Sequence, residues 1–351
     1  MSRLKPPSQV ILRVASLLSR NEKSPPQGLA VARFDVCNGD ADGLCAVRQW
    51  RLHDPSAAHL ITGLKRDIAL LQHVPCEASS QVLVCDLSMQ RNRAALDRLL
   101  DGGAQVRWFD HHWSGPVPAH ERLDAHLDFS SEVCTSLLVD RYLGGRYRAW
   151  ALVGAYGDEL TTVADRLGAA SGLDPLHRAV LRRLGLAINY NAYGEDASDV
   201  CIAPAELYER LARHASPWNL LRDEPVIHDI EACRRRDFRV AMGIKPHWES
   251  AQARVVVLPA APWSRRVSGF LANALAAVHP EQAQAVLTER RDGHYAVSVR
   301  APRASPQGAH TLCQAFGGSG RTAAAGIDAL PCTSLEPFVR ALSQTRWGAP
   351  C

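Results

Sequence analysis

Acidic side chains follow three short apolar segments in the first third of the chain, each at the point where the segment ends. They are Asp40 and Asp42, then Asp86, then Asp110. Carboxylate oxygens are preferred ligands of Mg²⁺ and Mn²⁺, so these acids could hold such ions if the fold brings them together. The first pair also has a simpler interpretation, because Asn-Gly-Asp and Asp-Gly sequences are common in turns.

Histidines and further polar residues extend this set of candidate ligands. They are His111 and His112 directly after Asp110, Asp158 in a Gly-Asp-Glu sequence, and Asn38 shortly before the first acids. Each could alone be a surface or helix-end residue. Together, carboxylates and neutral imidazoles favour two divalent ions of the Mn²⁺ or Mg²⁺ type over zinc bound by thiolates. Two such ions, roughly 3.5–4 Å apart, activate a water and hold the oxygens of an in-line phosphoryl displacement.

The elements that must position these residues alternate between strand and helix. Strands are predicted at 31–36, 60–64, 81–85 and 106–109, and helices at 44–52, 68–74 and 92–100. This alternation is typical of a parallel sheet with helices on both faces. Ligands of open α/β sheets bind at the carboxyl ends of the strands, so we expect acids far apart in the sequence to converge on one edge.

The chain becomes helical beyond residue 131 and returns to a mixed pattern near residue 245. Helices are predicted at 132–143, 150–156, 176–189, 204–213 and 226–239. A second α/β unit follows, with strands at 255–258, 285–288 and 295–300 and helices at 267–278, 310–316 and 335–342. The predicted organisation is an N-terminal extension (1–29), a catalytic metal-binding domain (30–200), a helical linker (201–247) and a smaller C-terminal α/β substrate-binding domain (248–351).

The bulk composition fits a globular protein that handles small anionic substrates. The 351 residues are 46% hydrophobic and carry a net charge of +4, which does not require a long nucleic-acid track. None of the ten cysteines forms a Cys-x-x-Cys pair, which argues against a zinc ribbon and favours buried thiols in a reducing, cytoplasmic compartment. No apolar stretch approaches the roughly 20 residues that a membrane span needs.

Two basic clusters and one aromatic segment leave alternatives open. Residues 234–236 and Arg265-Arg266 could follow a nucleic-acid backbone, although a solvated helix face is the commoner explanation. Segment 186–194 contains Tyr190 and Tyr193, which could stack a base, or cap a helix and pack between domains.

The motifs, taken in order, resemble those of the DHH phosphoesterase superfamily. They are Asn38-x-Asp40-x-Asp42-Gly43, Asp86, Asp110-His111-His112 and Gly157-Asp158. The second half resembles the DHHA1 domain: residues 297–300 look like its substrate-side strand, and residues 317–321 with 324–326 look like its GGGH-x-x-AAG loop. The superfamily includes RecJ-type exonucleases, nanoRNA- and pAp-degrading enzymes, cyclic-dinucleotide phosphodiesterases and family II pyrophosphatases. The resemblance covers about residues 33–330.

The resemblance implies a role for each matching position. Asp40 would hold one ion, Asp42 the other, and Asp86 would bridge them, with His111 and Asp158 completing the second ion's ligands. The further catalytic residues would be His112 near the reacting phosphate, Asp110 orienting His111, and Asn38 as a neutral ligand. The substrate would be bound in the second domain by Arg300, Gly318, Ser319, Gly320 and Arg321.

Two positions depart from the family pattern. Val36 stands where many phosphatase-type members have a His, four residues before the first acid, and Asn38 would have to serve instead. Arg321 stands where the family loop has a His. An arginine does not give up its proton at ordinary pH, so Arg321 could hold negative charge but not protonate a leaving group.

We therefore expect a soluble Mn²⁺-dependent phosphoesterase, with Mg²⁺ as the alternative ion. Its substrate would be a phosphodiester or phosphomonoester of a small nucleotide or short single-stranded oligonucleotide, hydrolysed by water that two metal ions activate. We expect no membrane partner, and a homodimer is compatible with the sequence. Two alternatives stay open. One is a catalytically decayed nucleotide-binding or regulatory module, motivated by Val36 and Arg321, and the other is a pyrophosphatase or polyphosphatase, which the DHHA1-like loop disfavours.

Overall fold

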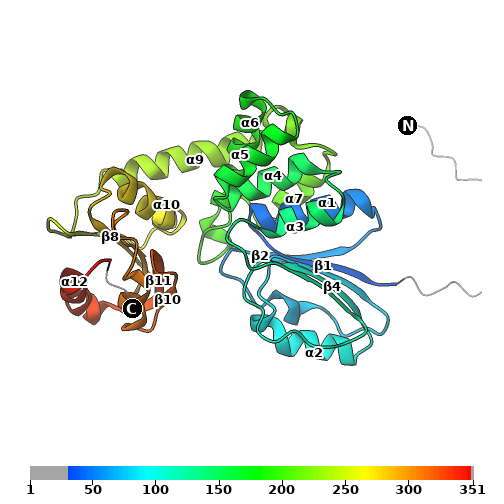
Figure 1. The fold of residues 1–351 in the computed structure, drawn as a ribbon, viewed down its shortest axis with the longest axis horizontal. Coiled ribbons are helices and arrows are strands. Elements are labelled where there is room, and N and C mark those ends of the chain that lie inside the picture. Colours follow the sequence, from blue (N-terminus) through cyan, green and yellow to red (C-terminus); the bar gives the residue numbers. More distant parts are fainter. Residues whose placement is uncertain (1–30, 349–351) are drawn as a thin grey trace, which may run out of the picture. The chain divides into compact units, whose positions relative to one another are not determined.

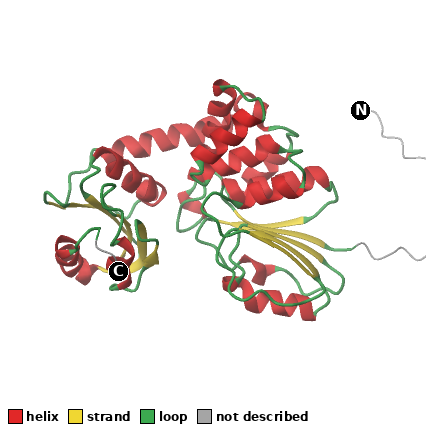
Figure 2. Cartoon of the chain, viewed as in Figure 1, coloured by secondary structure: helices red, strands yellow, loops and turns green. Residues whose placement is uncertain are grey.

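The computed structural model describes residues 31–348, and the predicted N-terminal extension lies outside them. From Ala32 onward the chain forms one compact unit. This unit contains two sheets, each with its own helices (Figures 1 and 2). No helix in the described part is long and apolar enough to cross a membrane.

The first sheet has five parallel strands in the order β2-β1-β3-β4-β5. The strands are β1 (Arg33–Asn38), β2 (His59–Gly63), β3 (Gln81–Cys85), β4 (Gln105–Asp110) and β5 (Leu123–Leu127). The chain passes from β1 to β2 on one side and then to β3 on the other, so the order reverses between β1 and β3. In open α/β sheets, ligands bind at the carboxyl ends of the strands at such a reversal.

Helices cover both faces of this sheet, which confirms the predicted fold class (Figure 1). They are α1 (Ala41–His53), α3 (Thr135–Tyr142), α4 (Arg148–Gly157), α5 (Thr161–Ala170) and α6 (Pro175–Tyr190) on one side, and α2 (Arg93–Asp101) on the other. Strand β3 is apolar from Val82 to Cys85 because helices cover both of its faces. Leu83 joins the apolar cluster under α1, whereas Val84 joins the cluster under α2.

The second sheet has six strands in the order β10-β11-β9-β8-β7-β6. They are β6 (Trp248–Glu249), β7 (Ala253–Leu258), β8 (Ala283–Glu289), β9 (His294–Arg300), β10 (Ser319–Gly320) and β11 (Ala324–Pro331). Its helices are α10 (Pro262–Val278), α11 (Ala309–Gln314) and α12 (Leu335–Gln344). Strands β7 and β8 are parallel and the other pairs antiparallel, so this is a mixed α/β unit, as expected.

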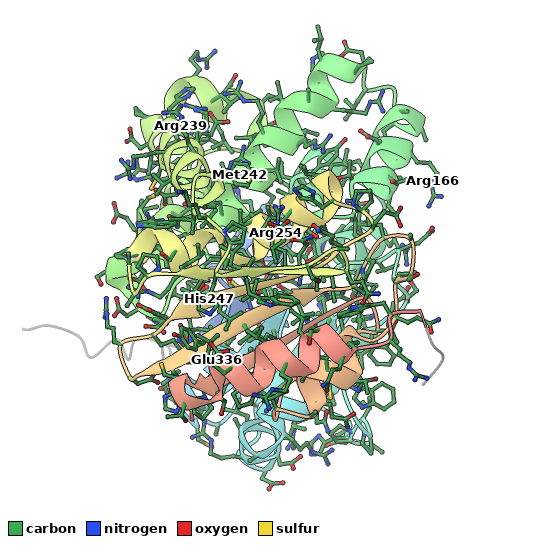
Figure 3. The ribbon with its side chains drawn as sticks, turned by 90° about the vertical axis from the view of Figure 1, so that its left-hand side faces the viewer. Arg166, Arg239, Met242, His247, Arg254 and Glu336 are labelled. Carbon is green, nitrogen blue, oxygen red and sulfur yellow. The ribbon has the colours of Figure 1, made fainter. Side chains whose placement is uncertain are left out.

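The remaining helices lie between the two sheets in the sequence. They are α7 (Pro204–Ala212), α8 (Leu220–Asp223) and α9 (Pro225–Met242). Helix α9 contacts both α6 and α10, so it packs against helices of both parts. Figure 3 labels His247 and Glu336 among the side chains of the second part; His247 Nε2 lies 3.7 Å from Glu336 Oε1 on α12.

Several elements differ from the sequence prediction. Strand β5 and helix α5 were not predicted, and segment 68–74 forms only a short 3₁₀ turn at Leu70–His73. Residues 324–326, expected in a loop, belong to strand β11. Alanine and glycine have low strand propensity, but pairing with β9 and β10 on either side overrides that preference.

The basic pair on α10 does not lie on the surface. Arg265 and Arg266 are both buried. Arg265 Nη2 lies 2.6 Å from Asp199 Oδ1, and Arg266 Nη2 lies 2.5 Å from Asp237 Oδ2 on α9. Both interpretations of this pair, as a contact to a nucleic-acid backbone and as a solvated helix face, are wrong, because a buried acid neutralises each guanidinium.

Candidate metal centre

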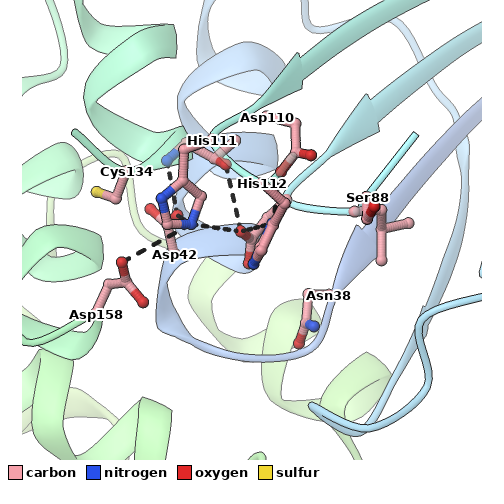
Figure 4. Close-up of polar contacts among 12 residues, drawn as sticks. Asn38, Asp42, Ser88, Asp110, His111, His112, Cys134 and Asp158 are labelled. Carbon is pink, nitrogen blue, oxygen red and sulfur yellow. Dashed lines mark hydrogen bonds and ion pairs between the residues drawn. The ribbon is translucent and has the colours of Figure 1, made fainter. Parts of the chain in front are cut away.

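Five candidate ligands converge beyond the carboxyl ends of β1, β3 and β4 (Figure 4). They are Asp42, Asp86, His111, His112 and Asp158. Ligand atoms of Asp86, His111 and His112 lie within 4.8 Å of one another, and so do those of Asp42, His111 and Asp158. The convergence of strand-terminal acids that the sequence predicts is therefore found in the structure.

His111 is the centre of this cluster, and Figure 4 shows it directed toward the surrounding acids. Its Nε2 lies 3.5 Å from Asp86 Oδ1, 3.9 Å from Asp158 Oδ2 and 4.0 Å from Asp42 Oδ2. Burial alone would lower the pKa of His111, but the hydrogen bond with Asp86 and the nearby acids raise it to about 10. The surrounding acids therefore favour a positive charge at this imidazole.

Asp42 is held in place by the start of helix α3. The backbone N–H of Thr135 donates to its Oδ2 and that of Ser136 donates to its Oδ1, both at 2.7 Å. Thr135 Oγ1 also donates to Asp86 Oδ1 at 3.3 Å. The amino end of a helix stabilises negative charge, so α3 favours ionised acids at this point. The sequence does not reveal this contribution, because it depends on how α3 packs against α1.

Asp40 begins helix α1 and pairs with a lysine that was not among the predicted site residues. Its Oδ1 accepts the backbone N–H groups of Asp42 and Gly43 at 3.1 Å, and its Oδ2 lies 2.5 Å from Lys65 Nζ. Burial alone would raise the pKa of Asp40, but the Lys65 ammonium lowers it overall. The sequence did contain a signal for Lys65, because this residue follows strand β2 just as the acids follow their strands.

Lys65→Met is expected to destabilise the metal-free protein, because the buried Asp40 carboxylate loses its cation. The cost should be roughly 1–2 kcal/mol, below the 3–5 kcal/mol typical of breaking a fully buried pair, since the Lys65 side chain is 33% exposed. Urea unfolding in EDTA measures this, with the exposed Lys245→Met as the matched control. Equal unfolding midpoints for the Lys65 variant and the unmodified protein would contradict the pairing.

Asp86 has a strained backbone and an unfavourable electrostatic position. Its φ is 60°, in the left-handed region that non-glycine residues rarely adopt. Burial, followed by the charges of Asp40 and Asp42, raises its pKa well above the usual carboxyl range. This turn places the buried Asp86 carboxylate close to Asp40 and Asp42, which is energetically unfavourable unless a cation lies between them.

Asp158 closes the cluster from the end of α4. Gly157 precedes it, and a Cβ at that position would lie 2.3 Å from the Ala41 Cβ, so glycine permits the close packing of α4 on α1. Burial and the charge of Asp42 raise the pKa of Asp158 to about 6. This acid therefore belongs to the centre rather than to an isolated helix-end turn.

The predicted hydrogen-bond partner of Asp110 is not the one found in the structure. The resemblance implies that Asp110 orients His111, but its Oδ1 lies 2.7 Å from Nδ1 of His112. Burial alone would lower the pKa of His112, but this hydrogen bond raises it to about 9. The side chain of His112 is 48% exposed, so a largely protonated imidazole faces solvent beside the acids.

The side chain of Val36 lies on the α2 face of strand β1, away from the acids. Val36 is fully buried in the apolar cluster on the α2 side, so its side chain does not reach the acids. Asn38 ends the same strand; its Oδ1 accepts the backbone N–H of Asp40, and its Nδ2 donates to the Lys65 carbonyl oxygen, both at 3.3 Å. Asn38 thus lies beside the first acid, as expected, and fixes the two residues of the ion pair.

Two small pockets adjoin the acid cluster and share Lys65 and Asp158. One, of about 100 Å³, is lined by Asn38, Asp40, Lys65, Ile68, Asp86, Leu87, Ser88, His112 and Asp158. The other, of about 210 Å³, is lined by Lys65, Gly157, Asp158, Glu159, Tyr193, Gly269, Phe270, Asn273 and Arg300. Both lie within the compact unit formed from Ala32 onward.

Residues of the second sheet contribute unequally to these pockets. Arg300 lines the larger one, and its Nε donates to Asn273 Oδ1 at 2.6 Å. Ser319 and Gly320 form the exposed strand β10 with Arg321 just beyond it, and none of the three lines either pocket. Gly318 is required by packing, since a Cβ there would lie 2.2 Å from the Gly326 carbonyl oxygen. Substrate contacts by residues 318–321 stay a prediction.

Comparison with known proteins reveals similar solved structures. Neither a protein-family model nor a curated protein sequence matches the chain. A DHH domain described as a member of a family of ribosomal proteins has a TM-score of 0.63 at 13% identity, covering 90% of this chain and 86% of that one. RecJ from Thermus thermophilus, solved with Mn²⁺, has a TM-score of 0.59 at 20% identity, covering 88% of this chain.

A third similar structure is the pGpG-specific phosphodiesterase PggH from Vibrio cholerae. Its TM-score is 0.50 at 14% identity, and the match covers 89% of this chain and 97% of that one. The match to the Thermus RecJ covers 51% of the RecJ chain, so the present protein spans about half of that enzyme. At these identities the likeness establishes a shared fold.

Proposed function

The chain has the fold of the DHH-domain proteins, and we propose that it is a metal-dependent phosphoesterase acting on a small nucleotide or short oligonucleotide. The observation that carries this proposal is the meeting of Asp42, Asp86 and Asp158 around His111, next to a pocket lined by Lys65 and Arg300. The acids can hold metal ions, and the cationic side chains can hold a phosphate. This combination suits the transfer of a phosphoryl group to water.

The residues fit divalent ions of the Mn²⁺ or Mg²⁺ type. Carboxylate oxygens and imidazole nitrogens are suitable ligands, and the raised pKa values of Asp86, Asp158 and His111 mean that the metal-free centre takes up protons in place of a cation. Asp42, Asp86, His111 and Asp158 would hold one ion. A second ion at Asp40 and Asp86 would require the Lys65 ammonium to move, because both Asp40 oxygens already have partners. When bound, the ions supply an activated water and neutralise phosphate charge.

The chain's own side chains would then bind and orient the substrate. Lys65 lines both pockets and Arg300 lines the larger one, so a phosphate between them meets positive charge from two sides. Asp110 holds Nδ1 of His112, which leaves Nε2 as the nitrogen able to face the substrate. With its pKa raised to about 9, His112 carries a proton at neutral pH and can give it to a leaving oxygen.

The size and lining of the pockets favour a short substrate. Their volumes, about 100 and 210 Å³, place them together at the lower end of the roughly 300–1,000 Å³ range of small-molecule sites. Tyr193 lines the larger pocket and packs against Phe270, with ring centroids 5.4 Å apart. An aromatic face there could stack a nucleobase, so a mononucleotide or dinucleotide suits the space better than a long strand.

A hydrolysis assay with purified protein tests this proposal. The panel contains thymidine monophosphate p-nitrophenyl ester, pAp, a labelled dinucleotide, a longer single strand, c-di-AMP, c-di-GMP, pyrophosphate and polyphosphate, each with Mn²⁺, Mg²⁺ or EDTA. We expect metal-dependent cleavage, with the mononucleotide or dinucleotide fastest. Preferential cleavage of pyrophosphate or polyphosphate would replace the proposed substrate class. Metal and nucleotide binding without any turnover would support the alternative of a binding module.

Arg300→Gln is expected to raise KM roughly tenfold while leaving kcat within a factor of a few, because Arg300 binds the phosphate equally in ground and transition states. Arg321→Ala should also raise KM, but less, since Arg321 is exposed and lines neither pocket. Steady-state kinetics on the best substrate of the panel separates the two parameters. A collapse of kcat in the Arg300 variant at unchanged KM would show instead that this guanidinium acts on the transition state.

A further inference from the structure

Glu159 directly follows the candidate metal ligand Asp158 and has an unusual backbone for its residue type. Helix α4 ends here: Glu159 has a φ of 64°, and the backbone N–H of Leu160 donates to the Ala155 carbonyl oxygen at 2.9 Å. This is the left-handed turn that commonly ends a helix, and glycine is the residue that usually occupies it. A glutamate at such a strained position points to a use of its side chain.

The Glu159 side chain is hydrogen-bonded to an amide of the second part. Its Oε1 accepts from Nδ2 of Asn273, on α10, at 2.8 Å. Oδ1 of the same amide accepts from Nε of Arg300, at the end of β9, at 2.6 Å. All three residues line the pocket of about 210 Å³ that also contains Asp158. Two consecutive hydrogen bonds therefore link Glu159 to Arg300 at the edge of the candidate site.

The chemistry of the three groups fixes the direction of both hydrogen bonds. A guanidinium only donates and an ionised carboxylate only accepts, so Asn273 must present its oxygen to Arg300 and its nitrogen to Glu159. An amide can do both at once, whereas a leucine of similar size can do neither. Rotation of the amide would break both bonds, so Glu159 holds Asn273 in the orientation that Arg300 requires.

These contacts leave one end of the Arg300 guanidinium for a ligand. Nε is held by Asn273, and Nη1 donates to the Val299 carbonyl oxygen at 3.0 Å. Nη2 has no hydrogen bond to another described residue. Because the guanidinium is planar and rigid, holding two of its nitrogens also fixes the third. Arg300 thus keeps one donor for the pocket that it shares with Lys65.

We propose that Glu159 and Asn273 are positioning residues for Arg300, and that their two hydrogen bonds hold its guanidinium in place to bind the substrate phosphate. Glu159 and Asp158 are consecutive, so the turn that ends α4 supplies a metal ligand and, through Asn273, also supports the phosphate-binding arginine. The inference rests on the proposed hydrolase function, because that function assigns Arg300 to the substrate phosphate.

Steady-state kinetics on the best substrate of the hydrolysis panel test this role. Asn273→Leu keeps the size of the side chain but removes both bonds, so it should raise KM about fivefold with kcat within about twofold. Glu159→Met should raise KM about threefold, because Asn273 keeps its bond with Arg300 but loses its own support. Glu159→Gln should keep KM within about twofold, because its amide oxygen can still accept from Asn273.

Glu281→Met is the matched control, since Glu281 is also an exposed acid but lines neither pocket. That variant should have the kinetics of the unmodified protein. An unchanged KM in Asn273→Leu would overturn the proposal, and so would equal KM values in the Met and Gln variants of Glu159.

A double variant separates positioning from general damage to the fold. If Asn273 acts only through Arg300, adding Asn273→Leu to Arg300→Gln should change KM by less than about twofold, whereas independent effects multiply. The Mn²⁺ affinity of Glu159→Met, measured by calorimetry, should equal that of the unmodified protein, because Asp158 keeps its place. Multiplying effects in the double variant, or a loss of Mn²⁺ affinity that matches the rise in KM, would overturn the positioning role.

The positioning role and the proposed function fail in different ways. Without turnover, calorimetric binding of AMP in EDTA is the readout: Asn273→Leu should weaken it, and the double variant should bind no more weakly than Arg300→Gln. Turnover or AMP binding in which the two substitutions act independently would overturn the positioning role alone. Absence of both turnover and AMP binding would overturn it together with the proposed function.

Discussion

Replacing Asp86 with Asn is expected to lower kcat/KM by roughly 10³-fold or more while making the metal-free protein more stable. Removing residues that merely support metal ligands costs about 10–100-fold, and Asp86 is proposed as a ligand itself, at the centre of the cluster. The stabilisation has a separate cause. Asp86 is buried beside Asp40 and Asp42, which raises its pKa well above the usual value, so ionising it in the folded protein is unfavourable.

The sign of this effect depends on pH. Below the ordinary carboxyl pKa of 3.8, Asp86 is protonated in both the folded and unfolded states and has no effect. As the pH rises above that value, the unfolded chain ionises first, so Asp86 lowers the stability of the folded metal-free protein. Asn stays neutral and avoids this loss. We expect the Asn variant to melt a few degrees higher than the unmodified protein at neutral pH in EDTA, with the difference vanishing toward about pH 4.

Asn is the appropriate replacement because of the backbone at this position. Asp86 has a φ of 60°, and Asn adopts the left-handed region much more readily than Ala does. An Ala variant would combine loss of the carboxylate with backbone strain, whereas the Asn variant isolates the charge. Assays of hydrolysis and thermal unfolding in EDTA are made on the same preparation. Near-normal turnover would remove Asp86 from the centre, and a lower melting temperature would contradict the electrostatic explanation.

The affinity for Mn²⁺ is expected to rise by about tenfold or more per pH unit between about pH 6.5 and 8.5. In the metal-free protein the pKa of His111 is raised to about 10, so its imidazole is protonated throughout this range. An imidazole must be neutral to bind a metal, so the ion that binds His111 displaces this proton, together with any proton that the raised pKa of Asp86 leaves on that carboxyl. Asp158, with its pKa at about 6, is mostly ionised already and adds little to the slope.

Calorimetry in two buffers of different ionisation enthalpy counts the released protons directly. The expected result is one proton or more for the ion that binds His111, together with the affinity slope. His247→Asn is the matched control, since His247 is exposed on the second part of the protein and is paired with Glu336. That variant should keep the slope. Binding that is independent of pH would show that His111 is not a ligand of the ion.

The sequence predicts most of the elements correctly because their signals are local. The alternation of apolar segments and turns identifies β1 to β4 and the helices α1 and α2. The misses have physical reasons. Strand β5 is only half-buried along its length, so it lacks the continuous apolar run of the central strands. Strand β11 is rich in alanine and glycine and becomes a strand only through its neighbours.

The sequence by itself also determines which residues have the chemistry for a metal centre and that they stand at strand ends. The acids and histidines are identified by type and by the strand that precedes them, and these are properties of neighbouring residues. This was enough to predict the convergence of Asp42, Asp86 and His111, because the carboxyl ends of parallel strands share one edge. Asp158 follows a helix, and its place in the centre was implied only by the family resemblance.

Only the tertiary structure decides which of these side chains touch. The reversal of strand order between β1 and β3 brings Asp86 beside Asp42, and the neighbouring strand β2 brings Lys65 to Asp40. Strand β4 directs Asp110 to His112 rather than to His111. Such contacts join residues far apart in the chain, and a local pattern of apolar and polar residues is compatible with many strand orders and helix packings.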